Sequence, residues 1–367
     1  MLRPLVAACL TLTSILDACT AFQLRARDST LLYGRSLEFA LPLDSAILIV
    51  PRGAHFQGSA PTGAIATQWD VKYGYVGMNQ NFAPNLVSDG MNEEGFVVGA
   101  LYLPDFASYQ AAGPQSSQKA LAAWEVPSLL LGSCKSVREA KELLASLLVA
   151  QVPPPGIAGL LLPLHFYLAD ASGAVAVIEY VDGARREYDN PLGILTNSPP
   201  FDWQLLNLRN YINLSPMNVE VLNLGKMKLK PLGQGSGLLG LPGDFSPASR
   251  FVRAAFFTQS ALTPLNGIEG VRLAFHLLNT FDIFEGAIQS SGQGAPPYLR
   301  KRGLEKTQWA IVHDQTHLKS YVRMYEGLLI ERVDFDQIDF KRGELRQIAP
   351  TRDFQTVGVS EKASPLN

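Results

Sequence analysis

The sequence predicts an α+β fold built on antiparallel sheets. Segments with β-strand character fill the first hundred residues and return at 165–183 and near the end of the chain, while two segments with helical periodicity lie between them. Short turns rich in glycine, proline and asparagine join most of the strand segments, and hairpins of this kind connect antiparallel strands. Such a grouping is typical of α+β proteins rather than of alternating α/β proteins.

The first strands are expected at residues 21–25, 31–35, 46–50, 73–78 and 95–103, each bounded by turn residues. Residues 92–95, Asn-Glu-Glu-Gly, predict a turn at the start of the last of these strands. Ser136 and Glu139 form a capping box in front of residues 140–150, whose leucines fall at helical spacing. We therefore expect the first helix there.

Residues 165–183 predict a β-hairpin around an Asp-Ala-Ser-Gly turn. A second helix is expected to begin near Ser246, because Pro247 suits the first helical position and apolar residues follow at helical spacing. Residues 306–325 predict two closing strands around an Asp-Gln-Thr-His turn, and residues 360–367 predict a frayed tail.

The composition is that of an ordinary globular protein. The chain has 367 residues, of which 47% are hydrophobic and 17% charged, and its formal net charge is −2. Acidic and basic residues are interspersed. Neither a nucleic acid nor an anionic membrane surface is therefore an expected partner.

Residues 1–18 have the pattern of a secretory signal peptide. Arg3 supplies the positive start, residues 4–16 form an apolar run too short to span a membrane, and the small Ala18 precedes Cys19. We expect a periplasmic or secreted protein without stable membrane insertion, whose residues 19–367 form one domain. Cleavage leaves only Cys19 and Cys134, so disulfides are not expected to stabilise it.

The sequence contains no cofactor or metal motif in the structural context that the motif requires. Residues 235–240, Gly-Ser-Gly-Leu-Leu-Gly, match a dinucleotide-binding pattern but lie in a glycine-rich loop rather than between a strand and a helix. The five histidines show no metal-ligand spacing, and the residues around His313 and His317 alternate as in a strand. The Gly-x-Ser-x-Gly signature of α/β hydrolases does not occur. We expect neither a metal nor an organic cofactor.

Cys19 allows three interpretations. Residues 16–19, Leu-Asp-Ala-Cys, are similar to a bacterial lipid-attachment motif except for the aspartate, and lipidation would leave a catalytically silent, lipid-anchored binding protein. A lone cysteine is also commonly an inert buried side chain. In the third interpretation, cleavage after Ala18 gives Cys19 a free α-amine, so that one residue supplies both base and nucleophile.

This third interpretation makes demands on the rest of the chain. A free thiol with a pKa near ~8.5 is only about 3% ionised at neutral pH, so a fixed positive charge is needed to favour the thiolate. A carboxylate must orient the amine, and amide donors must stabilise an oxyanion.

Four blocks of the sequence meet these demands. Residues 19–39 (CTAFQLRARDSTLLYGRSLEF), 89–104 (DGMNEEGFVVGALYLP), 193–211 (GILTNSPPFDWQLLNLRNY) and 241–256 (LPGDFSPASRFVRAAF) resemble, in order, blocks of the choloylglycine hydrolase family, the bile salt hydrolases and penicillin V acylases. The resemblance implies an N-terminal nucleophile hydrolase fold, a four-layer αββα sandwich of two antiparallel sheets.

The resemblance also implies roles for individual side chains. Cys19 would be the nucleophile with its α-amine as general base, and Arg35 would stabilise the thiolate. Asn197 would donate a side-chain N–H to the oxyanion, together with a backbone N–H near Tyr102. Arg250 would complete the charge environment.

Three pocket positions are informative about substrate. Glu38 stands where the family has aspartate, which moves the carboxylate by about 1.5 Å, and its implied role is to orient the Cys19 amine. Phe39 replaces a tryptophan and keeps an aromatic wall in the acyl pocket. Tyr102 stands where bile salt hydrolases usually have asparagine and penicillin V acylases often have tyrosine, which favours the latter activity.

The expected function is therefore cysteine-dependent hydrolysis of a linear C–N amide through an acyl-enzyme. The expected substrates are small N-acyl amides, in the order penicillin V, an N-acyl homoserine lactone and a conjugated bile salt. Conjugated bile salt hydrolysis is the enzymatic alternative, and the sequence does not separate a hydrolase from an acyltransferase. Family analogy implies a homotetramer.

Overall fold

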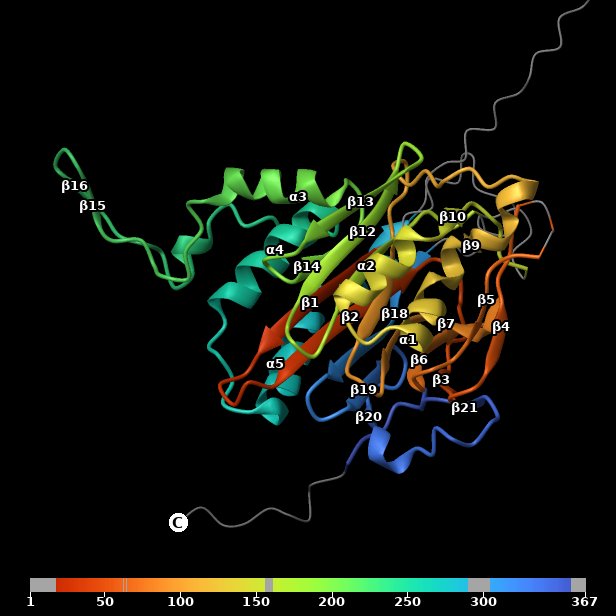
Figure 1. The fold of residues 1–367 in the computed structure, drawn as a ribbon. Helices are drawn as coiled ribbons and strands as arrows, with labels where there is room; N and C mark the ends of the chain where they lie inside the picture. Colours follow the sequence, from red (N-terminus) through yellow and green to blue (C-terminus); the bar gives the residue numbers. More distant parts are fainter. Residues whose placement is uncertain (1–17, 62, 64, 156–160, 290–303, 358–367) are drawn as a thin grey trace, which may run out of the picture.

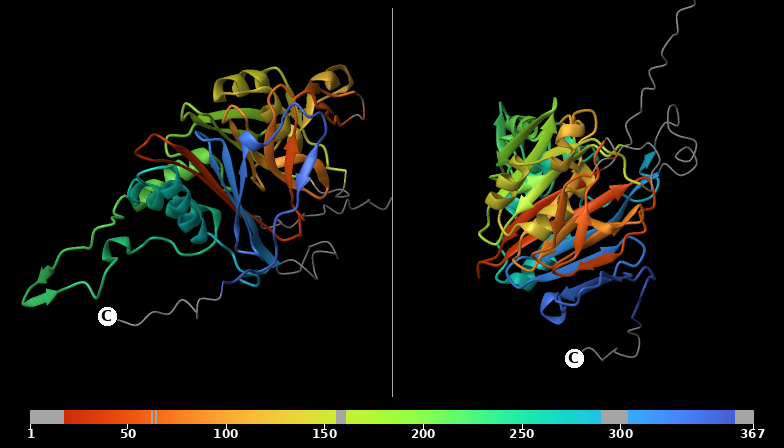
Figure 2. Two further views of the ribbon diagram at one scale, coloured as in Figure 1. Left: turned by 90° about the horizontal axis from the view of Figure 1, so that it is seen from below. Right: turned by 45° about the vertical axis from the view of Figure 1, so that its right-hand side comes forward.

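The computed structural model describes residues 18–61, 63, 65–155, 161–289 and 304–357. The predicted signal peptide up to residue 17 and the predicted tail at 360–367 lie outside these residues. Two large antiparallel sheets face each other, and helices cover their outer sides (Figure 1). The view from below in Figure 2 shows the layers side by side. The predicted α+β class and the four-layer αββα sandwich are confirmed.

The first sheet carries the predicted nucleophile. Its strand order is β14-β1-β2-β18-β19-β20, and β17 also pairs with β18. The strands are β1 (Cys19–Arg25), β2 (Leu31–Phe39), β14 (Ile194–Leu195), β17 (Ile288–Gln289), β18 (Leu304–Asp314), β19 (Lys319–Met324) and β20 (Ile330–Asp334). Every residue of β2 is buried, because the strand is central and both of its faces are covered.

The second sheet has the order β13-β12-β11-β8-β7-β6-β3-β21. Its strands are β3 (Ile47–Val50), β6 (Tyr75–Gln80), β7 (Ala83–Asn92), β8 (Val97–Tyr102), β11 (Leu164–Ala169), β12 (Val175–Val181), β13 (Ala184–Asp189) and β21 (Arg346–Ile348). The predicted hairpin at 165–183 is confirmed as β11 and β12.

Smaller pairs of strands decorate the sandwich. They are β4 (His55–Gln57) with β5 (Gln68–Asp70), β9 (Ala120–Ala122) with β10 (Leu148–Ala150), and β15 (Leu222–Leu224) with β16 (Met227–Leu229). Short 3₁₀ segments are η1 (Pro114–Lys119), η2 (Ala123–Glu125), η3 (Leu208–Tyr211), η4 (Ser236–Leu238) and η5 (Phe335–Gln337). The dinucleotide-like residues 235–240 surround η4 in an exposed excursion, in agreement with the loop expected there.

The helices form the two outer layers. On the first sheet, α4 (Pro247–Ser260) lies against β1 and β14, and α5 (Gly267–Asn279) lies against β2 and β18. On the second sheet, α1 (Val126–Ser133) packs against β7 and β8, with α2 (Val137–Ala145) beside it, and α3 (Phe201–Asn207) contacts α4. Among the residues described, no helix has the length and apolar character needed to cross a membrane.

The helix predictions are mostly confirmed, with one correction. Ser246 is the N-cap of α4, and the Ser136 hydroxyl accepts a hydrogen bond from the Glu139 N–H at 3.2 Å at the start of α2. The helix predicted over 140–150 is wrong in its last turn, because α2 ends at Ala145 and β10 follows. Residues 149 and 150 gain a buried parallel pairing with β9, which outweighs the helical spacing of the leucines.

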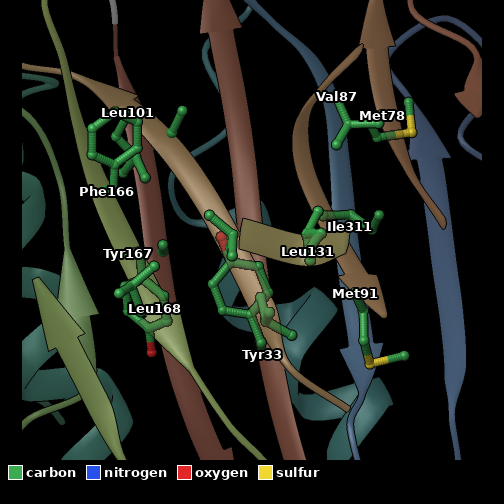
Figure 3. Packing of buried hydrophobic residues seen from close by; sticks show 14 of the residues in the cluster. Tyr33, Met78, Val87, Met91, Leu101, Leu131, Phe166, Tyr167, Leu168 and Ile311 are labelled. Atoms are coloured by element: carbon green, nitrogen blue, oxygen red, sulfur yellow. The ribbon is translucent and has the colours of Figure 1, made fainter. Parts of the chain in front are cut away.

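The space between the sheets is filled by apolar and aromatic side chains (Figure 3). Tyr33 and Ile311 come from the first sheet, and Val87, Met91 and Tyr167 come from the second. The rings of Tyr33 and Tyr167 lie 5.0 Å apart across the interface. This close packing fixes the distance between the sheets.

Candidate active site

Cys19 begins β1 and pairs with Leu37 of β2. Side chains alternate between the two faces of each strand, so that some residues of β1 and β2 face the second sheet and the others face the helices. Arg35 reaches Asp89 of the second sheet, whereas Thr20 contacts Arg250 of α4 on the opposite face. The Cys19 thiol therefore lies between the sheets, and Glu38, which has the parity of Thr20 on the paired strand, lies on the helix side.

Arg35, to which the resemblance gives the role of stabilising the thiolate, lies beside the sulfur, and that role stays a prediction. Its Nη2 lies 3.6 Å from Cys19 Sγ and donates to the Ala100 carbonyl at 2.5 Å. Its Nη1 donates to Asp89 Oδ2 and to the Ser88 carbonyl, both at 3.0 Å. Because the Arg35 and Asp89 side chains are at most 1% exposed, this guanidinium is a fixed and desolvated charge.

Burial has the largest effect on the pKa of Cys19 in the uncleaved chain. Burial raises the pKa of the Cys19 thiol, while the nearby Arg35 charge lowers it, and the pKa lies above its ordinary value. In this chain Ala18 is still joined to Cys19, so the Cys19 nitrogen is a peptide nitrogen without basic character. Arg35 alone does not offset the burial of the thiol.

Asn197 binds the backbone of Cys19. Its Oδ1 accepts the Cys19 N–H at 2.7 Å and Arg250 Nη2 at 2.6 Å. Its Nδ2 donates to the Tyr102 carbonyl at 2.9 Å. An amide nitrogen has two N–H groups, so the contact to Tyr102 leaves one for a reacting oxygen. The implied role of Asn197 as an oxyanion donor stays a prediction.

Arg250 does more than add positive charge. It is fully buried on α4, and its Nη1 donates to the Cys19 carbonyl and, at 2.9 Å, to Thr20 Oγ1. Its Nε donates to the Phe245 carbonyl at 2.9 Å. The arginine therefore anchors the first turn of α4, the start of β1 and Asn197 to one another.

Glu38 is buried on the helix side of β2. Its Oε1 accepts the Thr307 hydroxyl at 3.0 Å, and its backbone N–H donates to the Ala18 carbonyl at 2.8 Å. Burial raises the pKa of Glu38 to about 8, against the opposing effect of Arg250. Because the Cys19 N–H is bonded to Asn197, the implied role of Glu38 toward an α-amine stays a prediction.

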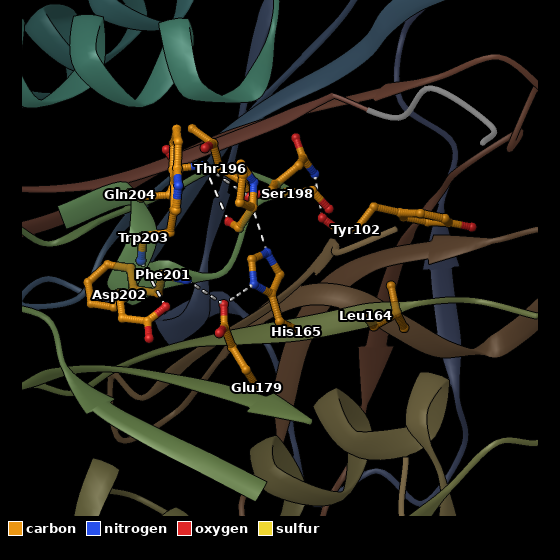
Figure 4. Close-up of polar contacts among 12 residues, drawn as sticks. Tyr102, Leu164, His165, Glu179, Thr196, Ser198, Phe201, Asp202, Trp203 and Gln204 are labelled. Atoms are coloured by element: carbon orange, nitrogen blue, oxygen red, sulfur yellow. Dashed lines mark hydrogen bonds and ion pairs between the residues drawn. The ribbon is translucent and has the colours of Figure 1, made fainter. Parts of the chain in front are cut away.

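Sequence reasoning missed a buried pair that holds the Asn197 segment (Figure 4). His165 Nδ1 lies 2.9 Å from Glu179 Oε1, which also accepts the Phe201 N–H at 3.0 Å. The other ring nitrogen, Nε2, lies 3.0 Å from the Thr196 carbonyl. The signal was available, because the hairpin pairing of Phe166 with Ile178 places residue 165 opposite residue 179.

A second missed network lies behind the sulfur. Asp89 accepts the Tyr33 hydroxyl at 2.7 Å and contacts His313 Nε2 at 3.1 Å, in addition to its ion pair with Arg35. His317 lies in the following turn and contacts Asp314 at 2.9 Å, so His313 and His317 do not act together. No group of three histidine, cysteine or acidic residues in the described part of the chain could hold a metal ion.

A pocket opens beside Cys19. Phe39 and Tyr102 both line it, as predicted, and their ring centroids lie 5.6 Å apart. The wall comes mainly from the second sheet and its loops and is largely apolar, including Phe82, Leu86, Val87, Trp124, Leu162 and Leu164. Such a lining suits an apolar acyl group whose carbonyl reaches the sulfur.

The two stacked antiparallel sheets with helices on their outer sides form a fold of the N-terminal nucleophile hydrolase type, and the residues around Cys19 are its candidate site. Residues 19–348 match the family described as linear amide C–N hydrolases, choloylglycine hydrolase family, and the chain belongs to this family. The protein is therefore a hydrolase of non-peptide C–N bonds in linear amides that acts on small molecules.

Relatives of two activities are similar to the chain. The bile salt hydrolase/transferase of Clostridium perfringens is 32% identical over 334 residues, covering 89% of this chain and 95% of that protein. The penicillin V acylase of Pectobacterium atrosepticum is 27% identical over 321 residues, covering 83% of this chain and 77% of that protein.

Solved structures agree with the fold. A mutant of the conjugated bile acid hydrolase from Clostridium perfringens superposes with a TM-score of 0.81 at 27% identity, covering 93% of this chain and 100% of that one. The penicillin V acylase from Agrobacterium tumefaciens gives 0.70 at 23% identity, covering 90% of each chain, and supports the fold alone.

Proposed function

We propose that the mature protein, residues 19–367, is a single-domain N-acyl amidase that uses Cys19 as its nucleophile once cleavage after Ala18 has released the α-amine. The observation that carries this proposal is the position of Cys19 Sγ, which borders the apolar pocket and lies 3.6 Å from the buried Arg35 guanidinium. A positive charge beside a thiol favours the thiolate.

The reaction follows from these positions. The α-amine takes the thiol proton, and the sulfur attacks the amide carbonyl to give a tetrahedral oxyanion. The second Nδ2 hydrogen of Asn197 and a backbone N–H near Tyr102 stabilise that oxygen. The α-ammonium then protonates the leaving amine, and water hydrolyses the thioester.

Release of the α-amine also explains how the thiol is activated. With Ala18 attached, burial keeps the pKa of Cys19 above its ordinary value. A protonated α-amine adds a positive charge on the same residue, next to the sulfur, and lowers the thiol pKa. The uncleaved chain is accordingly expected to be inactive.

The pocket favours an apolar or aromatic acyl group. The paired rings of Phe39 and Tyr102 and the apolar wall suit the aryl group of penicillin V best, then the chain of an N-acyl homoserine lactone. Hydrolysis of a conjugated bile salt is the second candidate, favoured by the 32% identity to a bile salt hydrolase/transferase.

An exposed hairpin supports self-association. The β15–β16 hairpin extends away from the sandwich (Figure 1, Figure 2). Its strands expose apolar side chains, Leu222, Leu224, Met227 and Leu229. Exposed apolar surface of this kind marks an interaction site, and we assign it to a second copy of the chain in a homo-oligomer, with a tetramer as the expected state. Leu222→Ser with Leu224→Ser should lower the mass measured by light scattering, and an unchanged mass would refute the assignment.

The position of Cys19 also bears on export. The family match begins at Cys19, which supports removal of the preceding residues as a signal peptide and a periplasmic or secreted enzyme. The rival, a lipid-anchored binding protein, would place a lipid on a thiol that is buried beside Arg35. That environment suits a nucleophile better than an anchor.

The decisive experiment is intact mass and turnover of the protein made in an exporting host. We expect a mass beginning at unmodified Cys19 and hydrolysis of penicillin V, an N-acyl homoserine lactone or glycocholate. Cys19→Ser should lose this activity, and the matched variant of the other cysteine, Cys134→Ser, should keep it. A diacylglycerol adduct, or residues retained before Cys19 in an active protein, would overturn the proposal.

A further inference from the structure

Glu305 is a buried acid for which neither the sequence nor the resemblance gives a role. It lies on β18, is 3% exposed, and precedes Thr307 by two residues. Residues two apart share a face of a strand, and Thr307 pairs with Glu38, so both glutamates lie on the helix side of the first sheet. Glu305 does not line the acyl pocket.

Ala18 lies between these two glutamates. The Glu38 N–H donates to its carbonyl at 2.8 Å, and the Ala18 N–H faces the Glu305 carboxylate and favours its charged form. Arg250 lies close enough to attract both carboxylates. The residue that cleavage would remove therefore lies next to both acids.

Two carboxylate oxygens in this cluster lack a donor. Within the described part of the chain, neither Oε1 of Glu305 nor Oε2 of Glu38 has a hydrogen-bond partner. Arg250 attracts both glutamates but also Asp244, and Asp282 adds a further negative charge near Glu38. Burial raises the pKa of Glu305 to about 7 and that of Glu38 to about 8. An unpartnered buried carboxylate is costly, so the cluster is short of one cation with N–H donors.

Cleavage would supply such a group at this place. The Cys19 nitrogen has a single N–H at present, and Asn197 accepts it. A terminal ammonium has three, which leaves two donors for two unpartnered oxygens. It also brings one positive charge to a cluster that lacks one.

We propose that Glu305 is a positioning residue, which together with Glu38 binds the α-ammonium of Cys19 in the mature enzyme and fixes the direction of its N–H groups. This inference rests on the proposed function, because it needs a free α-amine. It also assigns the amine two carboxylates, one from β2 and one from β18.

The test is the pH dependence of kcat/KM of Glu305→Gln, made as the full exported chain. A neighbouring carboxylate stabilises the ammonium, so its loss should move the acidic limb about one pH unit lower. The plateau of kcat should fall about tenfold because the amine is less well oriented, while KM should stay within about twofold. Glu285→Gln, at an exposed acid that pairs with Lys306 of the same strand, should leave the profile unchanged.

Glu305→Asp provides a second variant, should the glutamine variant fold poorly. The aspartate keeps the negative charge, but its side chain is shorter by about one bond length, so the carboxylate lies farther from the α-amine. The acidic limb of its pH profile should therefore lie between those of the wild type and Glu305→Gln. An acidic limb that coincides with the wild type in the folded variants would overturn the inference alone. A wild type that lacks a Cys19 terminus or turnover would instead refute the proposed function.

Discussion

His165 Nδ1 lies 2.9 Å from Glu179 Oε1, in a site where both side chains are fully buried. The other ring nitrogen faces the Thr196 carbonyl, which can only accept. This pair fastens the segment that carries Asn197 to the hairpin of the second sheet (Figure 4).

His165→Phe is expected to lower the free energy of unfolding by about 3–5 kcal/mol, since it leaves Glu179 buried without its imidazole partner and with only the Phe201 N–H as a donor. It should also reduce kcat, because the segment at Asn197 is released. His317→Phe, at an exposed turn, should change stability by less than about 1 kcal/mol. Urea unfolding and turnover give both quantities. Equal effects of the two substitutions would contradict the assigned role.

Arg35 and Asp89 are expected to separate stability from catalysis. Arg35→Met should destabilise the fold by about 3–5 kcal/mol because Asp89 remains buried without its guanidinium partner. Adding Asp89→Leu should restore most of that loss, since both charges are then gone, but not activity. The rate of alkylation of Cys19 at neutral pH should stay low in both variants. Recovery of turnover in the double variant would contradict the role of Arg35.

Gly99 is expected to tolerate no side chain. A Cβ at this position would lie 2.5 Å from the Tyr33 hydroxyl and 2.9 Å from Asp89 Oδ2. Gly99→Ala should therefore cost about 1–3 kcal/mol and displace the Arg35 network, lowering kcat. Gly113→Ala is the control, because no atom lies within 4 Å of its added Cβ. Thermal melting and turnover compare the two, and an active, stable Gly99→Ala would refute this reading.

The form that retains Ala18 is expected to lose stability as the pH rises. The pKa values of Glu38 and Glu305, about 8 and about 7, lie above their ordinary value of 4.5, so the folded state holds these protons more tightly than the unfolded state. Their stabilising contribution is complete below pH 4.5 and is lost as the pH rises through 7 and 8.

The check uses Cys19→Ala, made without export and shown by mass to retain Ala18. Its Tm relative to that of the same chain with Glu38→Gln should fall between pH 5 and 9, since glutamine does not ionise. A constant difference in Tm across this range would show that Glu38 does not titrate there.

The sequence predicted what depends on local pattern or on a contiguous block. The turn at Asp170–Gly173, the N-caps at Ser136 and Ser246, and the placement of Arg35 beside Cys19 all belong to this group. The α5 helix also had a local signal that was overlooked, because Asn266 accepts the Glu269 N–H at its start.

The contacts that were not predicted depend on which strands become neighbours. Asp89 meets Arg35 only because the two sheets stack, and Glu305 meets Ala18 only because β18 lies beside β2. The periodicity of apolar residues along the sequence does not predict such contacts between distant segments. The end of α2 was mispredicted for the same reason, since β10 exists through its pairing with β9.

The groups proposed to react and most of the wall of the pocket come from different sheets. Cys19, Arg35 and Glu38 lie on adjacent strands of the first sheet, while Phe82, Val87 and Leu164 belong to the second sheet or its connections. Substitutions in the wall therefore leave the register of β1 and β2 untouched. Substrate range can diverge during evolution while the chemistry is inherited unchanged, and directed evolution toward a new acyl group should begin at β6, β7 and β11.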